Sequence, residues 1–214
     1  MTVHTYAHHL ASRMLAGDGL LSVTAYRVDP LNTMTCLWHG MDRTGSVIVH
    51  FDTEDVSDIL HDDVEVRVDV VKSSLEVSED ITVASLHSLG RLEWLSVDEY
   101  TAVACIRLDS AHVHWPGGVE QLLPADIDPT VTLVDEIAVA DELYRIGLAN
   151  LVAVSEHIAH QPGVHSNNAG PALVWLADAC ELGALLVLAD GPDVTTLFTP
   201  TAAIQDVART LANA

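Results

Sequence analysis

The sequence predicts an α+β protein in which a small β-barrel with short helices precedes a compact α-β-β-β-α domain. About six segments of the first 124 residues show the period-two alternation of strands, interrupted only by short helical patterns. No βα unit there is long enough to repeat, which argues against a doubly wound sheet. The stretch LPADIDPT at 123–130 holds two prolines and changes the composition. We therefore expect a barrel domain over 1–124 and an α/β domain over 125–214.

The barrel domain is expected to begin with a helix and to continue mainly as strands. Tyr6, Leu10 and Met14 fall on one helical face, and Gly17 follows the end of the pattern. The expected strands are 20–26, 33–39, 46–51, 64–70, 81–95 and 111–115. The segment VEVRVDV at 64–70 alternates most regularly, with valines on one face and charged residues on the other.

Three connections complete the predicted barrel. A polar loop with two glycines joins 33–39 to 46–51 and predicts a hairpin. A short helix is expected over 53–60, where acidic residues suit the positive end of the helix dipole. Residues 97–108 are expected as a further acidic helix that begins after Ser96.

The strand ITVASLHSLGRLEWL at 81–95 is unusual because polar residues interrupt its middle. Leu86 and Leu92 belong to one face, whereas His87 and Arg91 project together from the other. Gly90 is expected to let a tightly curved strand bend, which is a structural role.

The second domain is expected to consist of one long helix, three strands and a closing helix. The helical pattern covers 133–160, and a turn-rich loop follows over 161–171. Two strands are expected within 172–189 and a third over 196–200, before a helix over 202–214.

The charge excludes some classes of partner. The chain has 31 acidic residues against 9 lysines and arginines, a net charge of −22. Such a surface repels phosphate backbones and anionic membranes, so we expect neither nucleic acid nor membrane as a partner. The N-terminus lacks the features of a secretory signal, and three scattered cysteines suit free thiols in a reducing compartment. A cytoplasmic location is the resulting expectation.

The order of elements resembles the FMN-binding split-barrel superfamily, which includes pyridoxamine-phosphate oxidases and bacterial haem-utilisation proteins. The resemblance rests on ASLHSLGRLEWL followed by DEYTAVACI, and on a tail in which Phe198-Thr199-Pro200 leads into the last helix. It implies an N-terminal split β-barrel, the small C-terminal domain of haem-utilisation proteins, and a homodimer with a small-molecule cofactor in a groove at the dimer interface.

In the flavin-binding members, a hydroxyl- and lysine-bearing turn holds the FMN phosphate. The matching run here is FDTEDVSDILHDD, in which Thr53 and Ser57 fall at the expected places. The position expected to hold the lysine falls near Asp58 instead. Five acids within 52–62 oppose a phosphate dianion. The cations that could compensate are Arg67, Lys72 and Arg91.

Haem requires an apolar slot, an axial ligand and cations for its propionates. The resemblance places His50 and His87 nearest to the ligand groove, so either is a candidate iron ligand, with Arg91 or Arg67 at a propionate. His112 and His114 share one face of a strand, but a metal would require a third ligand that the sequence does not identify.

Other histidines and motifs add little. His157 and His160 share a helix face and could clamp a metal, although a polar helix end explains them equally well. Walker, GxSxG, GxGxxG and HExxH motifs are absent.

Three functions remain open at this point. The first is binding of haem or a related tetrapyrrole, with assistance in haem degradation as a further implication of the resemblance. The second is a flavin-dependent oxidoreductase in which Thr53, Ser57, Lys72 and Arg91 surround FMN. The third is an interaction protein that has kept the barrel and uses no cofactor. The sequence leaves open whether the protein is an enzyme.

Overall fold

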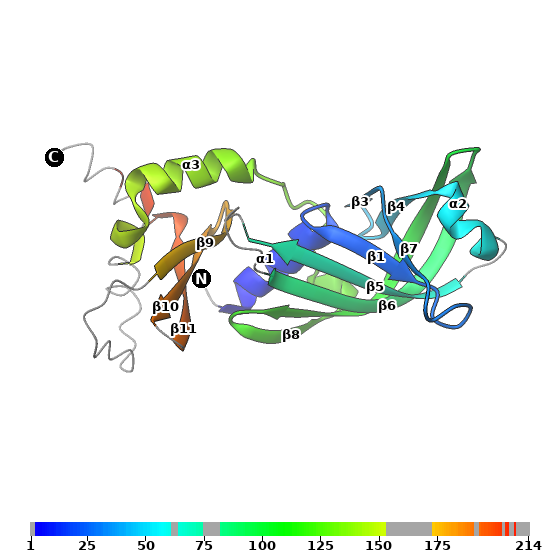
Figure 1. Ribbon diagram of the computed structural model, residues 1–214, viewed down its shortest axis with the longest axis horizontal. Coiled ribbons are helices and arrows are strands. Elements are labelled where there is room, and N and C mark those ends of the chain that lie inside the picture. Colours follow the sequence, from blue (N-terminus) through cyan, green and yellow to red (C-terminus); the bar gives the residue numbers. More distant parts are fainter. Residues whose placement is uncertain are drawn as a thin grey trace. The chain divides into compact units, whose positions relative to one another are not determined.

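The fold is a curled β-sheet with short helices and a second, smaller sheet (Figure 1), which confirms the predicted α+β class. The computed structural model describes residues 3–60, 64–74, 82–152, 173–190, 193–202, 204–205 and 208. Two compact units are present, Met1–Lys72 with Thr82–Leu133 and Ser73–Ile81 with Val134–Ala214. The predicted boundary between residues 124 and 125 stays a prediction.

The first unit is a half-barrel of eight strands. Its sheet order is β2-β1-β5-β6-β7-β4-β3, and β8 pairs with β7. The strands are β1 (Leu20–Thr24), β2 (Thr33–Thr35), β3 (Trp38–Met41), β4 (Val47–Asp52), β5 (Val64–Ser73), β6 (Thr82–Val97), β7 (Thr101–Trp115) and β8 (Gly118–Leu122). The helices are α1 (Val3–Leu15), α2 (Thr53–Val56) and the 3-10 helices η1 (Ser57–Ile59) and η2 (Pro124–Asp126).

The core of this unit lies between the curved sheet and α1 (Figure 1). Leu10 and Met14 of α1 are fully buried, as the predicted helical face requires. On β5 the alternation is equally clear, because Val66 and Val68 are fully buried and Arg67 between them is exposed. The apolar pattern of each element therefore decides which face of the sheet meets the helix and which meets water.

The predicted helix over 97–108 is wrong, because these residues form the β6–β7 turn and the first half of β7. The Asp98 side chain accepts hydrogen bonds from the backbone amides of Tyr100 and Thr101, at 2.9 and 2.8 Å. The acidic residues that suggested a helix start therefore close a tight turn. After it, β7 pairs with β6 on one side and β4 on the other, so strand pairing overrides the local helical pattern.

Two other predicted elements are divided. Segment 33–39 becomes two short strands, since β2 pairs with β1 whereas β3 pairs with β4. The predicted helix over 133–160 has a first part, α3 (Glu136–Ile146), which ends at Gly147 with φ of 92°. Residues 148–152 are helical again, and 153–160 lie outside the described residues.

The second unit is a three-stranded sheet with α3 packed against it. The sheet order is β11-β10-β9, formed by β9 (Leu173–Cys180), β10 (Gly183–Asp190) and β11 (Asp193–Pro200). Its buried core joins one face of α3 to the sheet and includes Leu143, Ile146, Leu176 and Leu186. Residues 201–202, 204–205 and 208 are helical where described, in line with a closing helix. Among the described helices, none has both the length and the apolar composition of a membrane crossing.

His39 is buried beneath α1, and we expect it to make the stability of the first unit depend on pH. Its Nε2 donates to the carbonyl oxygen of Met14 at 2.8 Å. Burial lowers the pKa of His39 below its usual 6.5, and the bond to Met14 and the charge of Asp18 oppose this only in part. The folded state therefore holds a neutral imidazole, while the unfolded chain binds a proton as the pH falls below 6.5.

We expect the free energy of unfolding to be highest above this pH and to decline as the pH falls through the lower, folded-state pKa of His39. In the His39→Gln variant this decline should be shallower, because glutamine keeps a donor and does not titrate. Urea unfolding at a series of pH values between about 7.5 and 5 measures it. Equal slopes for wild type and variant would show that His39 contributes nothing to the pH dependence.

Candidate functional site

The side of the half-barrel that faces away from α1 carries four of the seven predicted site residues, His50, Arg67, His87 and Arg91. We call it the outer face. Its side chains come from β4, β5, β6 and β7, where inward and outward residues alternate. The outer-face residues that matter below are His50, Arg67, Asp69, His87, Arg91, Val103, Arg107, His112 and His114.

His50 lies at one end of the outer face in apolar surroundings. In the sheet it is opposite Trp38 of β3 and Val103 of β7. The Trp38 and His50 rings meet edge to face, with centroids 5.0 Å apart and an interplanar angle of 66°. The imidazole is half-buried, while Trp38 is 54% exposed and Leu95, in a β-bulge of β6, is 56% exposed. A half-buried imidazole thus lies beside an aromatic ring that remains open to solvent.

The Trp38 ring can lie flat along β3 because the neighbouring Gly40 has no side chain. A Cβ at Gly40 would lie 2.7 Å from the ring carbon Cη2. Gly40 therefore leaves room for the Trp38 ring, which contacts His50.

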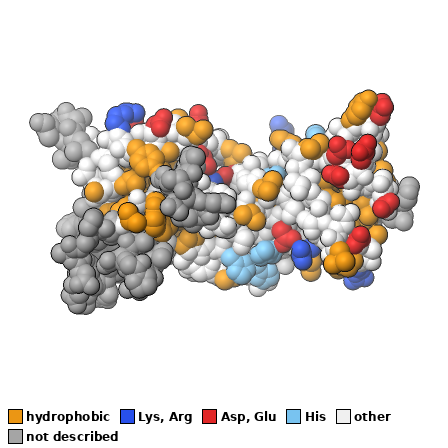
Figure 2. All heavy atoms as spheres, viewed as in Figure 1, with side chains coloured by type: hydrophobic (Ala, Val, Ile, Leu, Met, Phe, Trp, Pro, Cys, Tyr) orange, Lys and Arg blue, Asp and Glu red, His pale blue; other side chains and the backbone are white. Residues whose placement is uncertain are grey.

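His87 lies toward the other end of the outer face in polar surroundings. Its Nδ1 lies 2.6 Å from Asp69 Oδ1, and Arg67 Nε lies 2.7 Å from Asp69 Oδ2. His112 is its direct partner on β7, and the His114 ring centroid is 5.4 Å away at an interplanar angle of 74°. Figure 2 shows the resulting patch of histidine side chains with acidic and basic groups beside it.

The two candidate iron ligands are far apart. Their partners on β7, Val103 for His50 and His112 for His87, are nine residues apart along one strand. At about 3.3 Å per residue this corresponds to roughly 30 Å, too far for both imidazoles to bind one iron. Arg91 is opposite Arg107 of β7 and lies between the two histidines on the outer face.

The residues predicted to surround FMN are not gathered at one place. Thr53 Oγ1 donates to the carbonyl oxygen of Asp98 at 3.1 Å, and Ser57 Oγ donates to that of Glu54 at 3.3 Å. Lys72 is 3% exposed and its Nζ binds Asp18 Oδ1 at 2.5 Å. The expected hydroxyls are therefore used in hydrogen bonds to backbone carbonyl oxygens, and the lysine is buried inside the fold.

A pocket beside α2 also has the wrong charge for a phosphate. Its lining includes Asp29, Asp55 and Asp58 together with Met34 and Ile59. Asp55 and Asp58 of the acidic turn thus lie beside this pocket, where their negative charges oppose a dianion.

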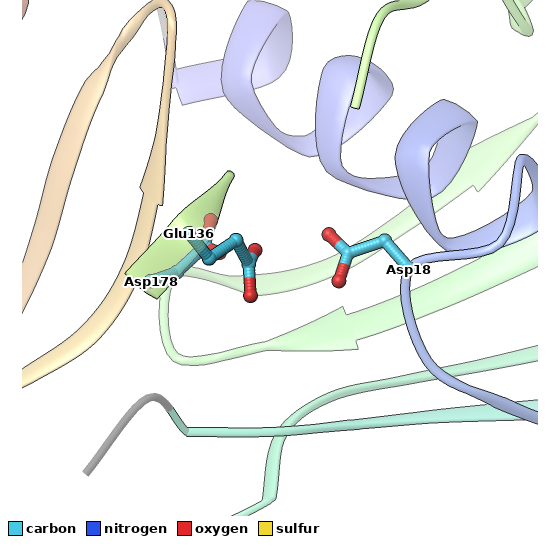
Figure 3. A group of neighbouring side chains, drawn as sticks. All are labelled: Asp18, Glu136 and Asp178. Atoms are coloured by element: carbon cyan, nitrogen blue, oxygen red, sulfur yellow. The ribbon is translucent and has the colours of Figure 1, made fainter. Parts of the chain in front are cut away.

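Figure 3 draws three carboxylates, Asp18 of the first unit and Glu136 and Asp178 of the second. Asp18 belongs to the first unit, where it binds Arg13 and Lys72. Within the second unit, Glu136 begins α3 and Asp178 lies on β9, and the carboxylate oxygens of these two residues lie within 4.8 Å of each other. Acidic side chains alone do not define a site, and we assign none to them.

Sequence reasoning did not find the third imidazole beside His112 and His114, nor the position of Arg107. Both depend on the register between β6 and β7, which a helix over 97–108 cannot provide. The period-two pattern of apolar residues over 102–108 is the signal that indicates the strand. His157, His160 and His165 lie outside the described residues.

Comparison with known proteins supports the fold. No family model matches the sequence, and no curated protein matches it. A solved structure of a haem-binding protein from Mycobacterium smegmatis matches with a TM-score of 0.52 and 12% identity, over 100% of this chain and 99% of that one. A protein of unknown function from Agrobacterium tumefaciens matches with a TM-score of 0.43 and 14% identity, over 99% and 97% of the two chains. The first likeness shows that the two chains share a fold.

Proposed function

We propose that this protein binds haem on the outer face, with His50 as the axial ligand. The observation that carries the proposal is the half-buried His50 imidazole beside the exposed Trp38 ring, with Val103 opposite His50 on the neighbouring strand β7. A haem needs one imidazole and a broad apolar contact, and this end of the sheet offers both. A solved structure with the same fold is that of a haem-binding protein, which supports the choice of ligand.

His50 fits this role better than His87. The His87 ring is committed to Asp69 and lies among Arg67 and two further histidines, all of which are well solvated. A macrocycle placed there would cover charged groups without replacing their water. Around His50, in contrast, a macrocycle would cover Trp38 and Leu95, which gain from losing water.

Arg91 is the cation best placed for a propionate. Arg107, its partner on β7, is four residues from Val103, the partner of His50. This is roughly 13 Å of strand, a span that a tetrapyrrole and an extended arginine side chain can cover together. Arg107 binds Glu93 at 3.0 Å, and Arg67 lies toward the His87 end.

A homodimer belongs to the same proposal. The outer face exposes apolar side chains, including Leu89 at 50% and Leu95 at 56%. A second copy over the His50 end of this face would bury Leu95 and would close a haem between two protomers, while the His87 end stays open to solvent. The assistance of haem degradation and the cytoplasmic location also remain proposals, the latter resting on Cys36, Cys105 and Cys180, which are free and buried.

We expect His50→Ala to weaken haemin binding at least about tenfold and to remove the sharpened Soret band, because the iron loses its protein ligand. His87→Ala is the matched control, since it removes another outer-face imidazole at a distance, and it should bind haemin like the wild type. Absorption titrations of the three proteins with haemin measure this.

Each of the other outcomes has a definite meaning. If His87→Ala loses binding and His50→Ala retains it, haem binds at the opposite end of the outer face. If the wild type shows neither saturable haemin binding nor flavin colour, the cofactor-free interaction protein becomes the better description. A yellow preparation with releasable flavin would support the FMN-dependent alternative, against the acidic surroundings of α2.

A further inference from the structure

We propose a second ligand site on the outer face, where His87, His112 and His114 bind one divalent transition-metal ion of the type that prefers imidazole, with Zn²⁺ as the representative. Asp69 positions the first of these histidines. The site lies at the opposite end of the outer face from His50 and does not depend on haem binding.

The strand register brings three imidazoles to one spot. His112 and His114 lie two residues apart on the solvent side of β7, and β6 places His87 directly opposite His112. Side chains at directly opposed positions have Cβ atoms about 5 Å apart, and diagonal neighbours remain within reach of a ring. The 5.4 Å separation of the His87 and His114 rings shows this contact.

Asp69 prepares His87 to act as a ligand. Its carboxylate accepts a hydrogen bond from Nδ1 at 2.6 Å, which leaves the lone pair on Nε2. A carboxylate behind the non-ligating nitrogen is the usual arrangement for a metal-binding histidine. The other carboxylate oxygen of Asp69 accepts a hydrogen bond from Arg67 Nε. The positive charge of Arg67, which would repel a metal cation, is therefore compensated at short range.

Three neutral imidazoles and one water give the tetrahedral set that Zn²⁺ accepts. The rings of His87 and His114 stack edge to face, so binding requires rotation about the side-chain torsions. All three side chains are exposed, and such rotations between staggered rotamers meet no packing barrier. On the neighbouring strand β8, Gln121 is opposite His112 and Val119 is opposite His114, so neither position places a cation beside the histidines.

Calorimetric titration with ZnCl₂, in a buffer that does not bind zinc, tests the proposal. Histidines elsewhere in the chain can bind zinc as well, so the comparison is between variants. The triple variant His87→Gln, His112→Gln and His114→Gln should lose one equivalent of Zn²⁺ relative to the wild type. His50→Ala is the control and should lose none, whereas the triple variant should bind haemin like the wild type.

Two further results sharpen the test. Asp69→Asn should lower the affinity for this one Zn²⁺ ion about 10- to 100-fold, since asparagine can hold the His87 ring but lacks the negative charge of the carboxylate. With Co²⁺ as the probe, the wild type should give the intense visible bands of a tetrahedral site, and the triple variant should not. Equal zinc stoichiometry and affinity in the wild type and the triple variant would overturn the proposal.

Discussion

Replacing Asp18 by Asn is expected to lower the free energy of unfolding by about 3–5 kcal/mol, the largest single effect that we predict. Arg13 and Lys72 are 1% and 3% exposed, and Asp18 binds both, at 2.5 Å in each case. Asparagine keeps the size of the side chain but removes the negative charge shared by two buried cations. The variant and the wild type should be compared by urea unfolding at neutral pH.

Glu93→Gln is the matched control for this change. It removes the acidic partner of Arg107 from an ion pair whose side chains are 50% and 73% exposed. Water screens such a pair, so the loss should be at most about 1 kcal/mol. A loss below about 1 kcal/mol for Asp18→Asn as well would show that the buried network does not stabilise the unit.

Replacing Gly90 by Val is expected to cost about 1–3 kcal/mol of stability and to disturb the curvature of β6. A Cβ at this position would lie 2.5 Å from the carbonyl oxygen of Arg107 and 3.2 Å from Ile106 Cγ2. The backbone of β7 would have to move away, and the register shift between Leu89 and Gly90 lies at the same point. Gly90 is not among the glycines with positive φ, so close approach of the strands is the cause.

Leu89→Ala provides the comparison, because Leu89 is the adjacent residue and its side chain is half exposed. We expect a change within about 0.5 kcal/mol. Thermal unfolding of both variants gives the result. If Gly90→Val is as stable as Leu89→Ala, the close approach of β6 and β7 does not restrict this position.

The sequence predicted the fold class because its most regular apolar patterns correspond to the faces that are buried in the core. The valines of β5 and the apolar stripe of α1 face the core as expected. The role predicted for Gly90 as a structural residue agrees with its contact to β7. These features depend on periodicity within a single element, which a sequence displays directly.

The errors concern features that depend on partners distant in the sequence. Residues 97–108 have a plausible helix start, and only pairing with β4 and β6 makes them a strand. The candidate site also depends on partners distant in the sequence. Strand register places His112 opposite His87 and sets the distance between His87 and His50. Lys72 looked like a phosphate ligand in the sequence, whereas the fold buries it beside Asp18.

The central claim is that His50 is the axial ligand of a bound haem, and a ligand exchange at this residue tests it most directly. In the His50→Cys variant a thiolate replaces the imidazole, and the ferric absorption spectrum should change from an imidazole-ligated to a thiolate-ligated form. His87→Cys should leave the wild-type spectrum unchanged. A His50→Cys spectrum identical to that of the wild type, at the same haemin affinity, would contradict the assignment.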